Sequence, residues 1–269
     1  MDVYGLDGKV EKDVSLPSVF SEEYRPDLVK RALLAEQSRQ FQPQGHSLTA
    51  GFQTTAVYIG SYDAAYRRGR HMGQAIRPRQ KLGGGAMGDV RRIPSAVKGH
   101  RAHPHKIEKI LREEINSREY AKAIRSAIGA CTHTDLIKQR HDFAGKAFPI
   151  VVDDKIEAIT KTKELMKVLE SLGMGNDLRK SHKPKIRHGL KRSAKIRHFR
   201  SSVLIVSKSS EKINKAGRNI PGVDVCSINE LTISKLAPGA LPRISIWTQG
   251  ALSEIENAVT AEAIKKRGE

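Results

Sequence analysis

Short apolar runs alternate with amphipathic stretches through the second half of the chain. Apolar runs bounded by polar or glycine-containing sequence are typical of strands buried on both faces. The stretches between them carry apolar residues at helical spacing. This alternation predicts an α/β fold, a three-layer αβα arrangement with a mostly parallel central sheet and right-handed crossovers. The expected strands are 148–152, 203–206, 223–228 and 244–247.

Two helices are expected among these strands. One ends before Gly173, a residue that suits the end of a helix, and the other begins near Thr248. Their inward-facing residues are Leu165, Val168, Leu169 and Leu172 in the first, and Leu252, Ile255 and Val259 in the second.

The first 40 residues predict a hairpin followed by a helix. Residues 2–10 alternate in polarity around a turn at Asp7-Gly8, which indicates two antiparallel strands. Pro26 with Asp27 is typical of a helix start. The expected buried side of this helix consists of Leu28, Val29, Ala32, Leu33 and Ala35.

Helical spacing returns after Pro104. We expect a helical region there, since Ile107, Ile110, Leu111 and Ile115 follow a helical repeat. Asn116 with Glu119 is a candidate capping pair for the next helix. That helix would carry Tyr120, Ala123, Ile124 and Ile128 inward, and residues 135–140 would add a further turn.

Residues 41–105 do not follow the alternation. They have almost no apolar periodicity, many glycines, and prolines at 43, 78 and 94. A connection this long without regular structure is rare in a compact domain and is usually functional or disordered. With little to bury, the segment is expected to order only against a partner. It is predicted as an extended loop inserted in one α/β domain that spans residues 1–269.

The net charge adds to this prediction because it is concentrated in two segments of the chain. The net charge is +19, of which residues 41–105 carry +8 and residues 179–200 carry +10. The rest of the chain is therefore nearly neutral. Two strongly basic appendages predict a polyanionic partner, since each phosphate contact releases condensed counterions. Solubility is the competing explanation, but charge dispersed over the surface would serve it equally well.

The hydropathy and the cysteine content of the chain indicate which cellular compartment to expect. No apolar run is long enough to span a membrane, and the N-terminal sequence MDVYGLDGKV has no signal-peptide pattern, so neither membrane insertion nor secretion is expected. Cys131 and Cys226 lie far apart in sequence without a CxxC motif. They are expected to be reduced core thiols, with a disulfide as the lesser alternative.

The first basic appendage contains the string Gly83-x-Gly85-x-x-Gly88. A dinucleotide site needs this motif between a buried strand and a helix, and neither flank provides one. A phosphate-binding P-loop would need lysine and Ser or Thr where Asp89 and Val90 stand. We interpret the glycines instead as backbone that passes close to crowded phosphates.

The second basic segment, 179–200, contains the sequence KIRH twice. The ten-residue interval does not match one helical face, so two local phosphate-binding sites are expected. Histidine and Phe199, which lie between arginines, supply surfaces that can stack on exposed bases. A solvated charged helix is the alternative, which Pro184, Gly189 and the absence of acids disfavour.

Candidate catalytic and metal sites are few. Asp153-Asp154 follows an expected strand, where acids often form active sites, but a helix cap is the favoured interpretation. The histidines at 103, 105, 182, 188 and 198 lack zinc-like spacing, so no metal and no cofactor is expected.

Several motifs together resemble the large-subunit ribosomal protein four family, in its archaeal and eukaryotic branch. They are RRGRHMGQ at 67–74, LGGGAMGDVRRIPSAVKGHRAHPHK at 82–106, KIRHGLKRSAKIRHFR at 185–200 and RNIPGVDVCSINELTISKLAPGA at 218–240. The sequence ends at Glu269 without the lysine-rich tail of eukaryotic members, so an archaeal member is expected. Leu190 and Phe199 depart from the glycine and tyrosine usual in the family.

The resemblance implies a structural constituent of the cytoplasmic large ribosomal subunit that binds ribosomal RNA and is not an enzyme. Its loop would line part of the nascent-peptide exit tunnel beside large-subunit protein twenty-two and the nascent peptide. The expected tunnel-lining residues are Arg67, Arg68, Gly69, Arg70, His71 and Met72. The expected RNA-binding residues are Arg67, Arg68, Arg70, His71, Arg77, Arg79, Lys81, Gly83, Gly84, Gly85, Arg91, Arg92, Lys98, Arg101, Lys185, Arg187, Lys191, Arg192, Lys195, Arg197 and Arg200.

One alternative function remains open from the sequence. The same α/β body could belong to an RNA-modifying or nucleotide-dependent enzyme that uses Asp153 or Asp154 at a strand end. The two functions differ in where the unusual residues lie, at the sheet edge for the enzyme and in the basic appendages for the ribosomal protein.

Overall fold

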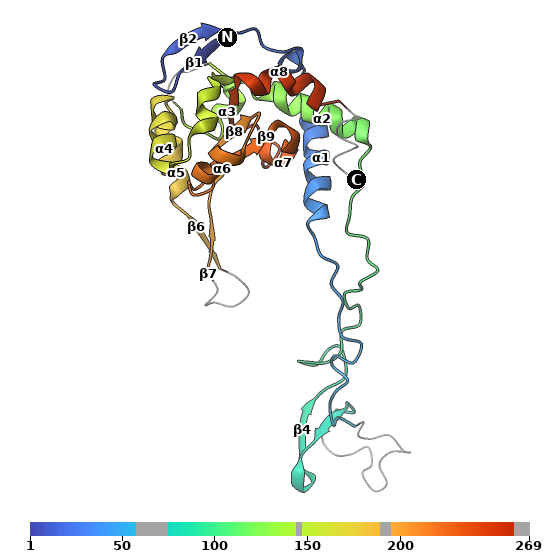
Figure 1. The fold of residues 1–269 in the computed structure, drawn as a ribbon. Coiled ribbons are helices and arrows are strands. Elements are labelled where there is room, and N and C mark those ends of the chain that lie inside the picture. Colours follow the sequence, from blue (N-terminus) through green and yellow to red (C-terminus); the bar gives the residue numbers. More distant parts are fainter. Residues whose placement is uncertain (58–74, 144–146, 189–194, 261–269) are drawn as a thin grey trace. The chain divides into compact units, whose positions relative to one another are not determined.

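The computed structural model describes residues 1–57, 75–143, 147–188 and 195–260. The chain divides into two compact units. The first, residues 1–40 and 112–269, is here named the body; the second, residues 41–111, is named the loop unit (Figure 1).

The body is built on a six-stranded sheet with the strand order β2-β1-β5-β10-β8-β9. β1 (Asp2–Tyr4) and β2 (Val10–Asp13) form the antiparallel hairpin predicted around Asp7-Gly8. All other pairs are parallel. The remaining strands are β5 (Ile150–Val152), β8 (Val203–Ser207), β9 (Asp224–Ser227) and β10 (Ile244–Thr248). The predicted α/β class with a mostly parallel sheet is confirmed.

Helices cover both faces of this sheet (Figure 1). On one face lie α1 (Pro26–Arg39), α2 (Ser117–Ala130), α7 (Ile233–Leu236) and α8 (Gln249–Ala258). On the other lie α3 (Thr134–Lys138), α4 (Thr162–Ser171), α5 (Gly175–His182) and α6 (Glu211–Gly217).

The strands show why the layers form. In β8, Val203 and Ile205 join one core cluster while Leu204 and Val206 join the other. Successive side chains of a strand point to opposite faces, so a continuous apolar run needs a helix layer on each side. The buried Trp247 packs edge-on against Phe20 with 5.2 Å between ring centroids. Short 3-10 helices also occur among the described residues: η1 (Ser18–Ser21), η3 (Asp154–Ala158) and η4 (Ile228–Glu230) in the body, and η2 (Gly83–Gly85) in the loop unit.

The helical region predicted after Pro104 is wrong. Residues 104–116 form no helix, and Ile107 and Ile110 are 66% and 88% exposed. A short helix in water depends on packing its apolar face, and these two side chains contact no core. Asn116 does precede α2, but its side chain makes no capping hydrogen bond, so only the position of the predicted cap is right.

The loop unit has some regular structure that its sequence pattern did not predict. β3 (Arg79–Lys81) and β4 (Met87–Val90) pair antiparallel, with Arg79 opposite Val90 and Lys81 opposite Met87. Val57 extends this pairing by a bridge to Arg79. Neither strand alternates apolar and polar residues, because almost nothing in the loop unit is buried.

Candidate nucleic-acid interface

The glycine string forms the turn of the β3–β4 hairpin. Gly83–Gly85 make the one-turn η2, and Gly84 has φ +70°, a backbone conformation that glycine adopts without strain. Gly88 lies inside β4, so a strand and not a helix follows the motif. The geometry that a dinucleotide needs is therefore missing at this string.

The turn is open to ligands. Gly83 and Gly84 are exposed, and a Cβ atom added at either would meet no chain atom within 4 Å. Their lack of side chains is therefore not required by packing within the described chain. This is the arrangement expected where a partner, and not the protein, approaches the backbone.

Most predicted basic residues of the loop unit that the structure describes have exposed side chains. They are Arg77, Lys81, Arg92, Lys98 and Arg101. Arg92 and Lys98 have φ of 71° and 60°, which is uncommon for residues with side chains. Such strained positions often occur at functional sites.

Arg91 and Arg79 differ from this group because they are partly buried. Arg91 donates from Nη1 to the carbonyl oxygen of Val97 at 2.6 Å and pairs through Nη2 with Asp89 at 3.0 Å. It thus closes the turn between 91 and 97. Arg79 forms backbone pairs with both Val57 and Val90. Both arginines hold the loop unit together as well as adding charge.

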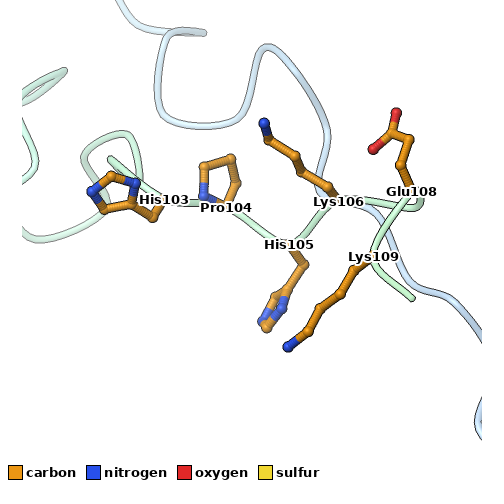
Figure 2. Close-up of a pocket in the computed structure, with 6 residues that line it drawn as sticks. All are labelled: His103, Pro104, His105, Lys106, Glu108 and Lys109. Atoms are coloured by element: carbon orange, nitrogen blue, oxygen red, sulfur yellow. The ribbon is translucent and has the colours of Figure 1, made fainter. Parts of the chain in front are cut away.

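A hollow of about 470 Å³ lies along the segment from His103 to Lys109. Figure 2 shows His105 and Lys109 extending to one side of the chain, and Lys106 and Glu108 to the other. The lining is mainly cationic, which suits phosphate oxygens. Lys106 and Lys109 were not among the predicted binding residues, because the helical spacing there was interpreted as a buried face. Their charge next to His103 and His105 was the available signal.

The two KIRH sequences are the two strands of one hairpin, here named the basic hairpin. β6 (Lys185–His188) and β7 (Lys195–His198) pair antiparallel, with Lys185 opposite His198 and Arg187 opposite Ile196. The interpretation as two separate local sites is therefore wrong, because strand pairing brings them side by side. The ten-residue interval leaves six residues between the two four-residue strands, and these six lie outside the described residues.

The described side chains of the basic hairpin are exposed. They are Lys185, Ile186, Arg197 and His198, and Phe199 beside the hairpin is also exposed. Arg187 and Lys195 lie in the strands. Arg200 differs, because its guanidinium is 31% exposed and lies 3.6 Å from the carboxylate of Asp177.

Eight predicted residues lie outside the described residues. They are Arg67, Arg68, Gly69, Arg70, His71, Met72, Lys191 and Arg192.

The acids at the end of β5 act as caps. Asp153 accepts a hydrogen bond from the Asp154 amide at 2.9 Å as the N-cap of η3. The predicted cap is therefore present, but on this 3-10 helix and not on α4, whose N-cap is Lys161. A hydrogen bond from Lys155 is the main cause of the lowered pKa of Asp153. Asp154 accepts from the Gly250 amide at 2.8 Å, in the first turn of α8.

Glu157 has a similar role before α6. It accepts from the Lys208 amide at 2.8 Å and from the Ser209 amide at 3.3 Å. The same carboxylate accepts from the Thr248 hydroxyl at 3.1 Å. Backbone amides that could bind an anion at this edge of the sheet are thus already bound to carboxylates of the chain.

Cys131 and Cys226 are buried, free thiols, as predicted. Burial raises the pKa of Cys131 to about 11 and that of Cys226 to about 12, so both stay protonated at neutral pH. They pack in the core cluster under α1, α2, α7 and α8.

Residues 1–57, 75–143, 147–188 and 195–260 contain neither a candidate membrane span nor a candidate metal site. No helix there combines the length and hydropathy that a membrane span requires. In the same residues, no three His, Cys, Asp or Glu side chains gather as metal ligands would.

Comparison with known proteins identifies the family of the chain. Residues 14–258 match the model of the Ribosomal protein L4/L1 family. Large ribosomal subunit protein uL4 of Methanocaldococcus jannaschii is 40% identical over 259 residues, which cover 94% of this chain and 97% of the relative. The protein of the same name from Methanoculleus marisnigri is 41% identical over 256 residues, covering 93% and 96%. That from Methanococcoides burtonii is 40% identical over 259 residues, covering 95% and 97%. The chain therefore belongs to the ribosomal protein L4/L1 family.

Proposed function

We propose that the chain binds large-subunit ribosomal RNA through the loop unit and the basic hairpin, and that the tip of the loop lines part of the nascent-peptide exit tunnel. Family membership makes the chain a structural protein of the large subunit of the cytoplasmic ribosome, not an enzyme. Ribosomal RNA and other ribosomal proteins are accordingly its partners.

The observation that carries the proposal is the composition of the loop unit's surface. Ala56 and Pro78 are the buried apolar residues among the unit's described residues. Phe41, Leu48, Val97, Ile107 and Ile110 are all more than 60% exposed. A segment that buries so little of its own apolar surface gains most of its order from a partner.

The charge of the same segment indicates what that partner is. The described residues of the loop unit include nine lysines and arginines against Asp89 and Glu108. Cationic side chains beside exposed glycine backbone suit phosphates, and the apolar and ring surfaces suit unpaired bases. Phe52 and His100 already stack, with 4.8 Å between centroids and 20° between planes. RNA offers both surfaces together.

The tunnel assignment rests on the resemblance to the family. It puts the loop tip within residues 67–81, next to large-subunit protein twenty-two and the nascent peptide. The basic and glycine-rich sequence there fits a narrow passage between RNA and peptide, since glycine lets the backbone approach closely. The tunnel-lining residues we propose are Arg67, Arg68, Gly69, Arg70, His71 and Met72.

The candidate catalytic residues of the enzyme alternative have another role in the structure. Asp153 and Asp154 both bind backbone amides of the chain's own helices. Both carboxylates therefore have capping roles at the sheet edge, and no observation favours a catalytic function over the structural one.

Salt-dependent binding tests the RNA-binding proposal. The quadruple variant Arg77→Gln, Lys81→Gln, Lys98→Gln and Arg101→Gln should bind large-subunit RNA more weakly, with the slope of log K against log salt smaller by up to about 0.9 per lost phosphate contact. The matched control replaces exposed lysines of the body, Lys122, Lys163, Lys167 and Lys212, by glutamine. Equal slopes for the two variants would contradict the interface.

Crosslinking tests the tunnel assignment separately. A photoreactive amino acid at Met72, in ribosomes that carry a stalled nascent chain, should crosslink to that peptide. The same group at Lys212 on α6 should not. Absence of the Met72 crosslink in assembled ribosomes would exclude the tunnel assignment while leaving RNA binding intact.

A further inference from the structure

We propose that Asp177 is a positioning residue for RNA binding, because its buried carboxylate fixes the direction in which the basic hairpin leaves the body. This inference rests on the proposed function, in which the basic hairpin binds RNA. It goes further by assigning the binding geometry to an acidic residue that cannot itself contact a phosphate.

Asp177 is fully buried in α5, eight residues before the first strand of the basic hairpin. Its Oδ2 atom accepts hydrogen bonds from the Ser202 hydroxyl and from Nδ1 of His141, the latter at 2.9 Å. Its Oδ1 atom accepts from the Asp142 amide at 3.3 Å and lies 3.6 Å from Nη2 of Arg200. One carboxylate therefore joins α5, the 141–142 turn and the chain just after β7.

These contacts hold both ends of the hairpin. α5 leads into β6 after two residues, and Arg200 and Ser202 follow β7 directly. Asp177 thus ties the incoming segment to the outgoing one. A hairpin anchored at only one end could swing, whereas one anchored at both ends keeps a fixed direction.

Gly222 provides an independent sign that the base is fixed. It has φ +84°, and a Cβ atom here would collide with the carbonyl oxygen of Arg200 and lie 2.7 Å from Cβ of Ser181. The Ser202 amide donates to its carbonyl oxygen at 2.7 Å, and the Ser181 hydroxyl donates to that of Pro221 at 2.9 Å. The 221–222 turn is therefore packed between the two ends of the hairpin.

The negative charge of Asp177 requires an explanation, because it lies beside a basic segment. A carboxylate next to ten basic residues opposes phosphate binding by simple electrostatics, and burying it is costly unless it is fully hydrogen-bonded. Burial alone would raise the pKa of Asp177, but the hydrogen bonds from His141 and Ser202 outweigh burial and lower it, so the charged form is kept. A fixed anchor for the arginine and serine beyond β7 explains why the acid is there.

Arg200 links the anchor to the binding surface. A guanidinium has five N–H donors in a rigid plane, and Nη2 of Arg200 lies 3.6 Å from Oδ1 of Asp177. Since the side chain is partly exposed, its outer edge remains available to a phosphate. Asp177 would then orient the arginine as well as the strand behind it.

The direction in which one substitution changes the affinity for RNA tests the proposal. Asp177→Asn removes a negative charge beside a basic segment, so electrostatics alone predicts tighter RNA binding. Positioning predicts the opposite: at least about ten-fold weaker binding to large-subunit RNA of Methanocaldococcus jannaschii, with a smaller salt slope as hairpin phosphate contacts are lost. Hydroxyl-radical footprinting should show weaker protection by the hairpin and unchanged protection by the loop unit. The control Asp135→Asn makes the same change at an exposed residue of α3 and should not weaken binding.

A second variant covers the case in which Asp177→Asn does not fold. Ser202→Ala removes one donor to Asp177 without changing charge, at a fully buried residue that RNA cannot reach. It should reduce the hairpin footprint selectively. Tight binding with an unchanged hairpin footprint in a folded variant would overturn the positioning role. Failure of the unaltered chain to bind RNA would instead overturn the proposed function.

Discussion

Asp154 accepts a 2.8 Å hydrogen bond from the backbone amide of Gly250, in the first turn of α8. In many parallel α/β proteins, such helix N-termini at the carboxyl end of the sheet bind the ligand. Here Asp154 accepts from an amide in the first turn of α8, and Glu157 accepts from an amide just before α6. The fold therefore has the edge that enzymes of this class use, but fills it with its own carboxylates. This agrees with the proposal that the basic appendages carry the function.

The double variant Asp153→Asn and Asp154→Asn tests this separation. Asparagine keeps a cap oxygen but loses the charge at η3 and α8, which should lower the free energy of unfolding by about 0.3–1 kcal/mol per cap. RNA affinity should not change, because neither residue lies in a basic appendage. Urea unfolding and filter binding measure the two quantities. An RNA-modifying activity that disappears in this variant would restore the enzyme alternative.

The loop unit should be sensitive to protease in the free chain. Lys98, Arg101, Lys106 and Lys109 are exposed in a segment without helix or strand, so trypsin should cut there first. Binding to large-subunit RNA should protect these sites while the body remains resistant in both states. Timed digestion followed by mass spectrometry locates the cuts. Resistance of residues 98–109 in the free protein would show that the loop unit is ordered without RNA.

The body could be predicted from sequence because its strands and helices have to bury apolar side chains. The run at 148–152 contains β5, the run at 244–247 covers all but the last residue of β10, and α4 ends before Gly173. Apolar spacing failed after Pro104 for the same physical reason. Ile107 and Ile110 follow a helical repeat, but the chain supplies no surface to cover them. Periodicity predicts structure only where a core exists to receive it.

The candidate interface was predictable in its charge but not in its geometry. The repeated KIRH gave no indication of strand pairing, because a polar hairpin lacks the alternation that marks a half-buried strand. Asp177 was also missed. Its importance comes from contacts with His141 and Ser202, 36 and 25 residues away, and nothing local in the sequence distinguishes it from a surface acid.

Arg243 should be a major determinant of stability. It is 1% exposed and donates to the carbonyl oxygens of Ser202, Val203 and Gly222 at 3.1, 2.7 and 3.0 Å. It also pairs with Asp224 at 2.5 Å. Breaking such a buried network costs about 3–5 kcal/mol, so Arg243→Met should lower the urea midpoint strongly.

The control for this prediction is Arg218→Met, which removes an exposed arginine at the end of α6. It should change the free energy of unfolding by less than about 0.5 kcal/mol. Similar urea midpoints for the two variants would show that the buried guanidinium contributes no more than a surface charge.

His141 should make the body less stable as pH falls. Burial lowers its pKa, although the hydrogen bond to Asp177 opposes this shift. Below about pH 6.5 the unfolded chain binds a proton at this residue before the folded chain does, so the free energy of unfolding decreases. His141→Asn keeps a side-chain N–H but does not titrate. Its melting temperature should fall less between pH 7 and pH 5 than that of the unaltered chain or of the exposed-site control His133→Asn. Equal slopes in all three would contradict the assignment.

Gly83→Ala tests whether the glycine is required for RNA binding or for the stability of the protein. A Cβ atom at Gly83 meets no chain atom within 4 Å, and its φ is not in the left-handed region, so the free energy of unfolding should stay within about 0.5 kcal/mol. If the turn passes close to phosphates, the added methyl group should still weaken RNA binding, by about ten-fold if close contact is lost. The salt slope should not change, because no charge is altered. Gly175→Ala, in α5 of the body, is the matched control, since its Cβ would lie 3.7 Å from Glu170 and no closer to any other group. Unchanged RNA affinity in Gly83→Ala would mean that this glycine serves the hairpin turn alone.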